Sequence, residues 1–255
     1  MMRSTALFLA TCALACAGLC EAQSSTIPPR HELSIGAGVS HGDRFDQVVS
    51  PSRFSGVSAT GRLSYDGLVK SARLRFDLRG GTGMLTGPST QRSDERVTDG
   101  DIHLSLFPAT GARALGGRVS LGLDAQTTAS VIAHHYPDPA AKTESYVFGT
   151  LTLGPSLLFE RPVGEGSVSA QLSVPVAGFV VQPYSALRNA RPPLDFRGAT
   201  LASLQSASGL FSYQTSQRRG MSMLYQYGLS MTRYEHALPV RGLSHSMTIG
   251  VGRAW

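Results

Sequence analysis

Apolar and polar residues alternate along most of this chain, in ten separate stretches. The sharpest stretch alternates Ala72, Leu74, Phe76 and Leu78 with Arg73, Arg75, Asp77 and Arg79. A period of two places successive side chains on opposite faces of a β-strand. We therefore expect an all-β protein whose strands each have one apolar face and one polar face.

The ten predicted strands differ in how strongly they show this pattern. They cover approximately residues 33–39, 57–65, 72–78, 102–106, 119–125, 147–159, 168–176, 198–213, 221–231 and 247–251. The eighth has the weakest alternation, which leaves eight or twelve strands as alternatives to ten. Several stretches reach about ten residues, the length that a tilted strand needs to cross a bilayer.

The connections between these strands alternate in length. Short turns are predicted at Asp66-Gly67 and at residues 108–116, 161–166 and 215–220, and mostly longer polar loops at 42–55, 80–98, 134–142, 183–197 and 235–242. Short turns at one end and longer loops at the other are typical of transmembrane β-barrels. An even number of strands would place both ends of the barrel on the short-turn, periplasmic side.

These features predict a single antiparallel up-and-down transmembrane β-barrel. In lipid, every backbone donor and acceptor must be paired within the protein, and a closed sheet achieves this. The alternative is a soluble β-sandwich, which would use shorter strands and would not need the asymmetry between turns and loops.

The first residues have the features of an exported protein. Arg3 precedes the apolar stretch 6–19, and small residues flank a cleavage position after Ala22. We expect a signal peptide at residues 1–22 and a barrel at residues 23–255. The three cysteines, Cys12, Cys16 and Cys20, all lie in the signal segment, so the mature chain would contain none; lipidation of one of them is the alternative.

Composition supports a membrane wall more than a soluble enzyme. Charged residues make up 16% of the chain, against about 25% in typical soluble domains. The formal net charge is +6 and the basic residues are dispersed, without a basic run interleaved with aromatics. Nucleic acid is therefore not an expected partner.

The last nine residues resemble the terminal strand of bacterial outer-membrane β-barrel proteins. Met247, Ile249 and Val251 alternate before the final aromatic residue Trp255, whereas Arg253 departs from the pattern. The resemblance implies an outer-membrane location, contact with outer-membrane lipid, and recognition of this ending by the barrel-assembly machinery. It names the class of protein and no family within it.

Aromatic residues near the strand ends suggest girdles at the two membrane interfaces. Those predicted for the short-turn side are Tyr65, Phe159, Tyr213 and Trp255, and those predicted for the loop side are Phe45, Phe54, Tyr136, Tyr146 and Tyr234.

Three motifs carry catalytic or metal-binding residue types, and none forms a complete constellation. Asp99-Gly-Asp101-Ile-His103 contains the Asp-x-Asp and Asp-x-His spacings of omptin-like proteases, but both on one strand. His103 and Ser105 have the His-x-Ser spacing of lipid A deacylases, but the pattern directs both away from lipid. His134 and His135 lie in a predicted loop without further fixed ligands. We expect no enzymatic activity, metal or cofactor.

The expected functional feature is a set of charged residues directed into the lumen. These candidates are Arg62, Arg73, Arg75, Asp77, Arg79, Arg118 and Asp124, with Glu160 as a further one. One interpretation is a salt-bridged plug inside a structural barrel. Another is a narrow pore that prefers small anionic solutes. A third class of function, an outer-membrane enzyme or a protein that binds ligands through its surface loops, is the alternative.

Overall fold

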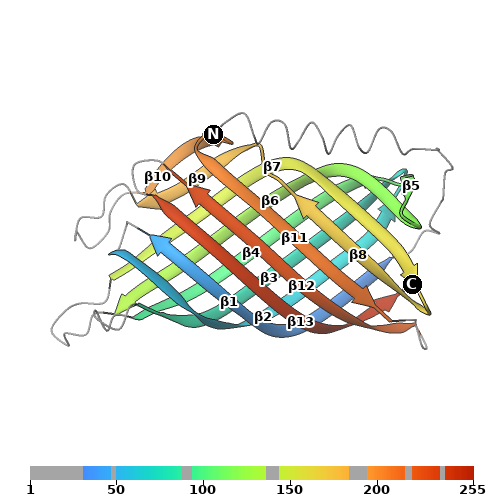
Figure 1. Ribbon diagram of the computed structural model, residues 1–255, viewed down its shortest axis with the longest axis horizontal. Helices are drawn as coiled ribbons and strands as arrows, with labels where there is room; N and C mark the ends of the chain where they lie inside the picture. Colours follow the sequence, from blue (N-terminus) through green and yellow to red (C-terminus); the bar gives the residue numbers. More distant parts are fainter. Residues whose placement is uncertain are drawn as a thin grey trace.

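The chain folds as a closed antiparallel β-barrel (Figure 1). The computed structural model describes residues 31–46, 50–87, 94–135, 144–183, 194–215, 220–235 and 239–255. The strands are β1 (Glu32–Asp46), β2 (Ser50–Val69), β3 (Ala72–Thr86), β4 (Asp94–Pro108), β5 (Ala112–Ala114), β6 (Gly117–His135), β7 (Glu144–Val163), β8 (Gly166–Ser173), β9 (Ala177–Pro183), β10 (Leu194–Thr200), β11 (Leu204–Gln214), β12 (Met221–Tyr234) and β13 (Val240–Ala254). The sheet closes because β1 pairs with both β2 and β13.

Ten strands form the wall, as predicted. β8 and β9 form one wall strand interrupted at residues 174–176, and β10 and β11 form another interrupted at residues 201–203. β5 is a short strand that pairs only with the start of β6. The eighth predicted strand had a weak pattern because it corresponds to the interrupted pair β10 and β11.

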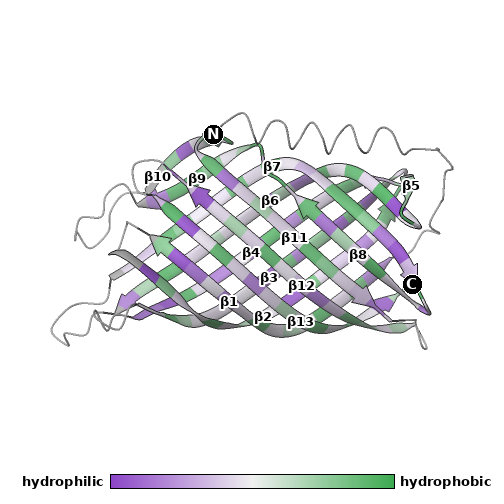
Figure 2. Ribbon diagram, viewed as in Figure 1, coloured by the Kyte–Doolittle hydropathy of each residue, from purple (hydrophilic) through white to green (hydrophobic). Residues whose placement is uncertain are grey.

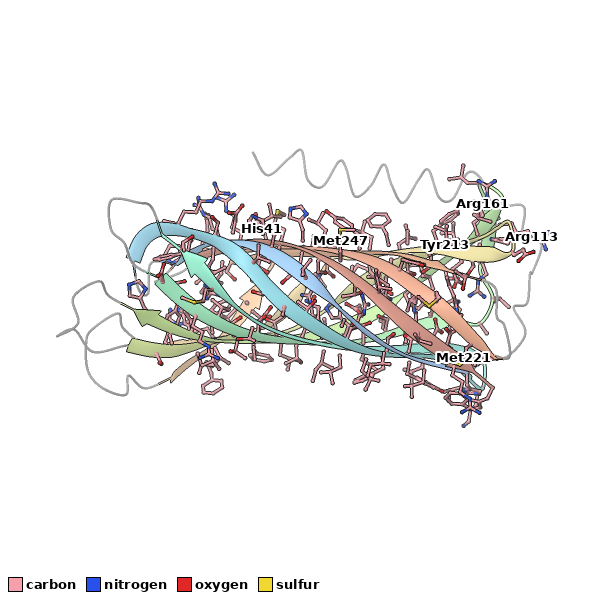
Figure 3. The ribbon with its side chains drawn as sticks, turned by 90° about the horizontal axis from the view of Figure 1, so that it is seen from below. His41, Arg113, Arg161, Tyr213, Met221 and Met247 are labelled. Atoms are coloured by element: carbon pink, nitrogen blue, oxygen red, sulfur yellow. The ribbon has the colours of Figure 1, made fainter. Side chains whose placement is uncertain are left out.

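Apolar and polar residues alternate along the strands of the barrel (Figure 2), and many of the large apolar side chains are exposed on its outer face. On the wall where β13 meets β1, Ile35 is 68% exposed and Met247 is 64% exposed, whereas Ser246 and Thr248 are buried. Figure 3 shows side chains along the whole outer surface of the barrel, Met247 and Tyr213 among them. This is the reverse of a soluble protein, and it matches a wall that faces lipid.

The two ends of the barrel differ. We call the end that holds Trp255 and the turns after β2, β5 and β7 the turn end, and the opposite end, where β1 and β3 finish, the loop end. The predicted loops 42–55 and 80–98 were too long, because the strands continue to Asp46 and Thr86 and resume at Ser50 and Asp94. The alternation fades there, since both faces carry Gly, Ser and Thr, while backbone pairing continues.

The predicted turn at Asp66-Gly67 was also wrong. Both residues lie within β2, and the chain reverses at Lys70 and Ser71. Asp66 accepts hydrogen bonds from Arg73 at 2.7 Å, which holds this part of β2 in the wall. The dipeptide has the composition of a hairpin turn, but it lies inside the strand because the pairing of β2 with β3 continues to Val69.

The turn between β5 and β6 contains a strained residue. Leu115 has a φ of 55° and Gly116 a φ of 72°, the combination of a type I′ turn. A left-handed conformation costs a bulky residue roughly 1–2 kcal/mol. We expect Leu115→Asn to stabilise the barrel by about 1 kcal/mol, because asparagine is favoured at this turn position. Urea unfolding in detergent measures the change; Leu115→Val, which adds β-branching, should destabilise, and an equal response to both would contradict this account.

Candidate functional site

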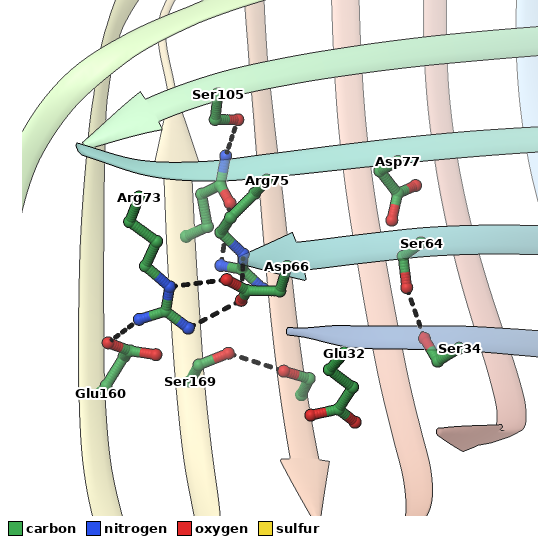
Figure 4. A network of polar contacts seen from close by, with 12 residues as sticks. Glu32, Ser34, Ser64, Asp66, Arg73, Arg75, Asp77, Ser105, Glu160 and Ser169 are labelled. Atoms are coloured by element: carbon green, nitrogen blue, oxygen red, sulfur yellow. Dashed lines mark hydrogen bonds and ion pairs between the residues drawn. The ribbon is translucent and has the colours of Figure 1, made fainter. Parts of the chain in front are cut away.

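The predicted lumen residues all lie on the inner face of the barrel. Arg62 is on β2, while Arg73, Arg75, Asp77 and Arg79 follow one another at alternate positions of β3. Arg118 and Asp124 lie on β6, where both are buried. Figure 4 shows how several of these side chains meet inside the barrel, together with serines from other strands.

The central element of the network is a chain of alternating charges that crosses the lumen. Arg73 on β3 donates two hydrogen bonds of 2.7 Å to Asp66 on β2 and also bonds to Glu160 on β7 (Figure 4). Glu160 accepts a second hydrogen bond, of 2.8 Å, from Arg118. Glu160 therefore binds two arginines. Its bond to Arg73 connects β7 with β3 across 87 residues of the chain. We call Asp66, Arg73, Arg118 and Glu160 the charge bridge.

The other arginines of β2 and β3 are also paired. Arg62 donates to Asp77 at 2.6 Å, and Arg75 lies 3.1 Å from Asp66. Arg79 bonds to Asp101 on β4 and donates to the Ser246 hydroxyl on β13 at 3.1 Å. Each of the five predicted arginines thus contacts at least one carboxylate.

A second polar chain connects β3, β8, β4 and β6. The Arg75 guanidinium donates to Gln171 Oε1 at 3.0 Å, and Gln171 Nε2 donates to Ser105 Oγ at 2.8 Å. Ser105 donates to Asp124 at 2.5 Å, and His103 Nδ1 lies 3.7 Å from the same carboxylate. The carboxylate therefore stands between the hydroxyl and the imidazole. A nucleophilic serine requires the imidazole beside it, so this order does not activate Ser105.

The Asp-x-Asp-x-His sequence of β4 faces the lumen from one wall. Asp101 is bound by Arg79 and His103 lies beside Asp124, so these two side chains have different partners. The protease interpretation requires a second carboxylate–histidine pair opposite the first. Among the described residues the other such pair, Glu95 and His134, joins the same two strands, β4 and β6, and so lies on the same wall.

Two cavities lie in the lumen and the charge bridge separates them. One, of about 140 Å³, is lined mainly by serine, glutamine and the charged residues of β2 and β3. The other, of about 570 Å³, opens toward the turn end and is lined in part by Arg113, Arg161 and Pro162. The residues that line both cavities are Glu32, Asp66, Arg73, Glu160, Ser167 and Gln214. The charge bridge and its neighbours therefore form a partition between the two spaces.

Two clusters of buried apolar side chains lie in the loop half of the interior. One cluster is Phe54, Leu85, Val97, Ile132 and Tyr146, and a second is Phe148, Val180, Ala199, Leu204, Tyr234 and Val240. The Arg44 guanidinium lies over the Phe148 ring, 5.5 Å from its centre. The lumen thus changes from apolar packing near the loop end to ion pairs toward the turn end.

These clusters correct part of the predicted aromatic girdle. Phe54, Tyr146 and Tyr234 are at most 8% exposed and point inward. Each of the three occupies an inward position of its own strand, as Arg62 does on the strand of Phe54, and nearness to a strand end does not determine the face. Tyr136 lies outside the described residues, while Tyr213 and Trp255, predicted at the turn side, are exposed.

The two adjacent histidines lie at the end of β6, so the prediction that they lie in a loop was wrong. His134 points inward, where its Nδ1 is 3.4 Å from Glu95 Oε1 and its ring meets Phe54 edge-on. Among the described residues, no group of three or more His, Cys, Asp or Glu side chains could hold a metal ion.

The sequence interpretation missed several members of the lumen network. The pattern predicts Asp66 in a turn and Asp101 in a protease-like motif, and Gln171 and Ser246 are not among the predicted lumen residues. Their positions in the alternation do indicate that Asp66 and Asp101 face inward. Asp66 lies four positions after Arg62, and Asp101 two positions before His103, all on the inward face. The alternation of apolar and polar residues along each strand does not show which strands face each other across the lumen.

The C-terminal residues lie where the barrel closes. Met247, Ile249 and Val251 face outward and pair with Val39, Ala37 and Ile35 of β1. Trp255 is 67% exposed at the turn end and its ring stacks on His31. Their role as an assembly signal remains a prediction, and the predicted signal peptide at residues 1–22 lies outside the described residues.

Comparison with known proteins supports the fold. No protein-family model and no curated protein sequence matches the chain. Among solved structures it is similar to the outer membrane protease OmpT from Escherichia coli, with 9% sequence identity, a TM-score of 0.56, and coverage of 92% of this chain and 99% of that one. It also matches the translocator domain of the autotransporter NalP from Neisseria meningitidis, with 10% identity, a TM-score of 0.43, and coverage of 98% and 97%. The first likeness shows that the chain has the fold of outer-membrane β-barrel proteins.

Proposed function

We propose that this protein is a non-enzymatic, structural barrel of the outer membrane whose lumen is closed to solutes. The observation that carries the proposal is the charge bridge, in which Arg73 and Glu160 join β2, β3, β6 and β7 across the interior. These long side chains meet inside a ten-stranded barrel. Open aqueous channels are characteristic of about 16–18 strands.

The outward surface supports the membrane location. Large apolar side chains such as Ile35, Leu121 and Met247 are more than half exposed, and such a surface is stable only against an apolar surrounding. Export through a signal peptide, insertion by the barrel-assembly machinery and contact with outer-membrane lipid complete the proposal.

The ion pairing favours a closed barrel over a pore that prefers anions. The smaller cavity is lined by four arginines, Arg62, Arg73, Arg75 and Arg79, and by five carboxylates, Glu32, Asp66, Asp77, Asp101 and Glu160. A pore for anions would need an excess of basic groups along its path. An enzymatic role would need an activated nucleophile or base, and the order of Ser105, Asp124 and His103 does not supply one.

Conductance in a planar bilayer tests the closed lumen. We expect no steady current from refolded protein that migrates as a folded barrel on unheated gels. The multiple variant Arg73→Ala/Arg75→Ala/Phe54→Ala/Tyr234→Ala removes two side chains that cross the lumen and one large ring from each apolar cluster of the loop half, so it should conduct ions. Arg161→Ala, which changes an exposed arginine beyond the charge bridge, is the matched control and should stay silent. A steady current through the unmodified protein would overturn the proposal.

A further inference from the structure

Exposed basic side chains gather on one part of the outer wall, near the loop end. Strand register makes Arg233 of β12 the neighbour of Arg241 of β13, Arg241 the neighbour of Phe45 of β1, and Phe45 the neighbour of Arg53 of β2. The three arginine side chains are 48%, 56% and 68% exposed. We call Arg53, Phe45, Arg233 and Arg241 the basic row.

The guanidinium groups of the basic row are held in place and are only partly neutralised. Arg233 and Arg241 donate hydrogen bonds of 2.8 and 2.7 Å to the same oxygen of Glu235. Both bonds favour the charged carboxylate, so the pKa of Glu235 lies below its ordinary value. Arg241 also lies 6.0 Å from the centre of the Phe45 ring, and Arg53 pairs with Asp43 at 2.8 Å. Two arginines that share one carboxylate leave a net positive charge on the outer surface.

Between the basic row and the apolar part of the wall, the outward positions carry both apolar and polar residues, beginning with Leu243 beside Asp43. Toward the turn end, His245 and His41 are register neighbours, and Tyr227 shares a hydrogen bond of 2.6 Å with His245. The next outward positions are Met247 and Val39, followed only by apolar residues to Val251 on β13. Figure 3 places His41 nearer the loop end than Met247 on the same wall.

The depth of the basic row fits the headgroup level of a membrane. On β12, Met221 is the first outward residue at the turn end and Arg233 is the last outward residue at the loop end. With a rise of about 3.4 Å per residue and a tilt of about 40°, they are roughly 30 Å apart along the membrane normal. An apolar band on such barrels is about 25 Å tall, so the row lies just beyond it at the outer leaflet if the turn end is periplasmic.

We propose that the wall formed by β12, β13, β1 and β2 binds a phosphorylated lipid headgroup of the outer leaflet. The guanidinium groups would contact phosphate, the histidines and Tyr227 the polar backbone of the lipid, and the apolar residues below them its acyl chains. A lipid is favoured over a free solute because the row is on the outer wall, continuous with the apolar surface, and not in a cavity. The inference rests on the proposed membrane location.

Binding of diphosphoryl lipid A to the refolded protein, followed by native mass spectrometry, tests this inference. We expect Arg241→Gln to weaken binding about fivefold and Arg233→Gln/Arg241→Gln to weaken it further, since each basic residue near a charged surface contributes roughly that factor. Arg96→Gln is the matched control, because Arg96 is an exposed arginine near the loop end of β4, outside the basic row. Glu235→Gln should strengthen binding, since it releases both guanidinium groups.

The same lipid without phosphates, and inorganic phosphate as a competitor, complete the design. Weak binding of the dephosphorylated lipid and no competition by millimolar phosphate are the expected results. Equal binding of both lipids, or equal loss in Arg96→Gln and Arg241→Gln, would overturn the inference, as would displacement of lipid by inorganic phosphate. Failure of the protein to insert into lipid vesicles would instead contradict the proposed membrane location, so the two failures are distinguishable.

Discussion

Replacing Glu160 with alanine is expected to lower the free energy of unfolding by about 3 kcal/mol. Glu160 accepts hydrogen bonds from both Arg73 and Arg118, whose side chains are 17% and 6% exposed. Without the carboxylate, two guanidinium groups remain in the interior with fewer partners. Removing one member of a buried ion pair costs more than the pair itself contributes, because the remaining charge stays desolvated.

Reversible unfolding in urea, monitored by tryptophan fluorescence and by the gel shift of unheated samples, measures this loss. Glu160→Gln should cost less, since the amide oxygen can still accept a hydrogen bond. Arg53→Ala is the matched control, because the Arg53–Asp43 pair is exposed and such pairs contribute about 0.5 kcal/mol or less. Equal losses for Glu160→Ala and Arg53→Ala would show that the charge bridge does not stabilise the barrel.

Replacing Gly38 with valine is expected to prevent closure of the barrel. A Cβ atom at Gly38 would lie 1.8 Å from the carbonyl oxygen of Met247 and 2.7 Å from the Cα of Thr248. Both atoms belong to the backbone of β13, so the two strands would have to separate where the sheet closes. We expect a loss of about 3 kcal/mol or more, the upper range for overpacking.

The yield of heat-modifiable barrel after refolding measures this effect. Gly61→Val on β2 is the control, because no atom lies within 4 Å of the Cβ position there. Normal yields from Gly61→Val and near-zero yields from Gly38→Val are the expected pair of results. A normal yield from Gly38→Val would mean that β1 and β13 tolerate a wider separation than the structure indicates.

The sequence predicted the wall of the barrel better than its interior. Each wall strand must present one apolar face to lipid, so residues such as Leu74 and Ile249 repeat at every second position and identify the strands. The alternation of apolar and polar residues stops where the strands no longer face lipid. Above the lipid-facing zone, β1 and β2 continue through Gly, Ser and charged residues, and the alternation no longer distinguishes strand from loop.

The lumen was predictable residue by residue but not as a network. Parity assigned Arg73 and Arg118 to the interior, yet nothing in their spacing relates them to Glu160 or to each other. Their meeting depends on the register of four strands and on the curvature of the closed sheet. Large apolar residues on the inner face, such as Phe54 and Ile132, were missed for a related reason, since an inward apolar cluster has no characteristic spacing along any single strand.

The links across the lumen also bear on how the barrel folds. Arg73 and Glu160 are 87 residues apart, Arg75 and Gln171 are 96 apart, and Arg79 and Ser246 are 167 apart. These contacts join strands that are not neighbours in the sheet, so we expect them to arise after the sheet has curved into the closed barrel. Interactions that are absent from the transition state act mainly on the unfolding rate. The charge bridge would therefore contribute kinetic stability: it would slow the loss of the finished barrel while leaving the rate of its formation nearly unchanged.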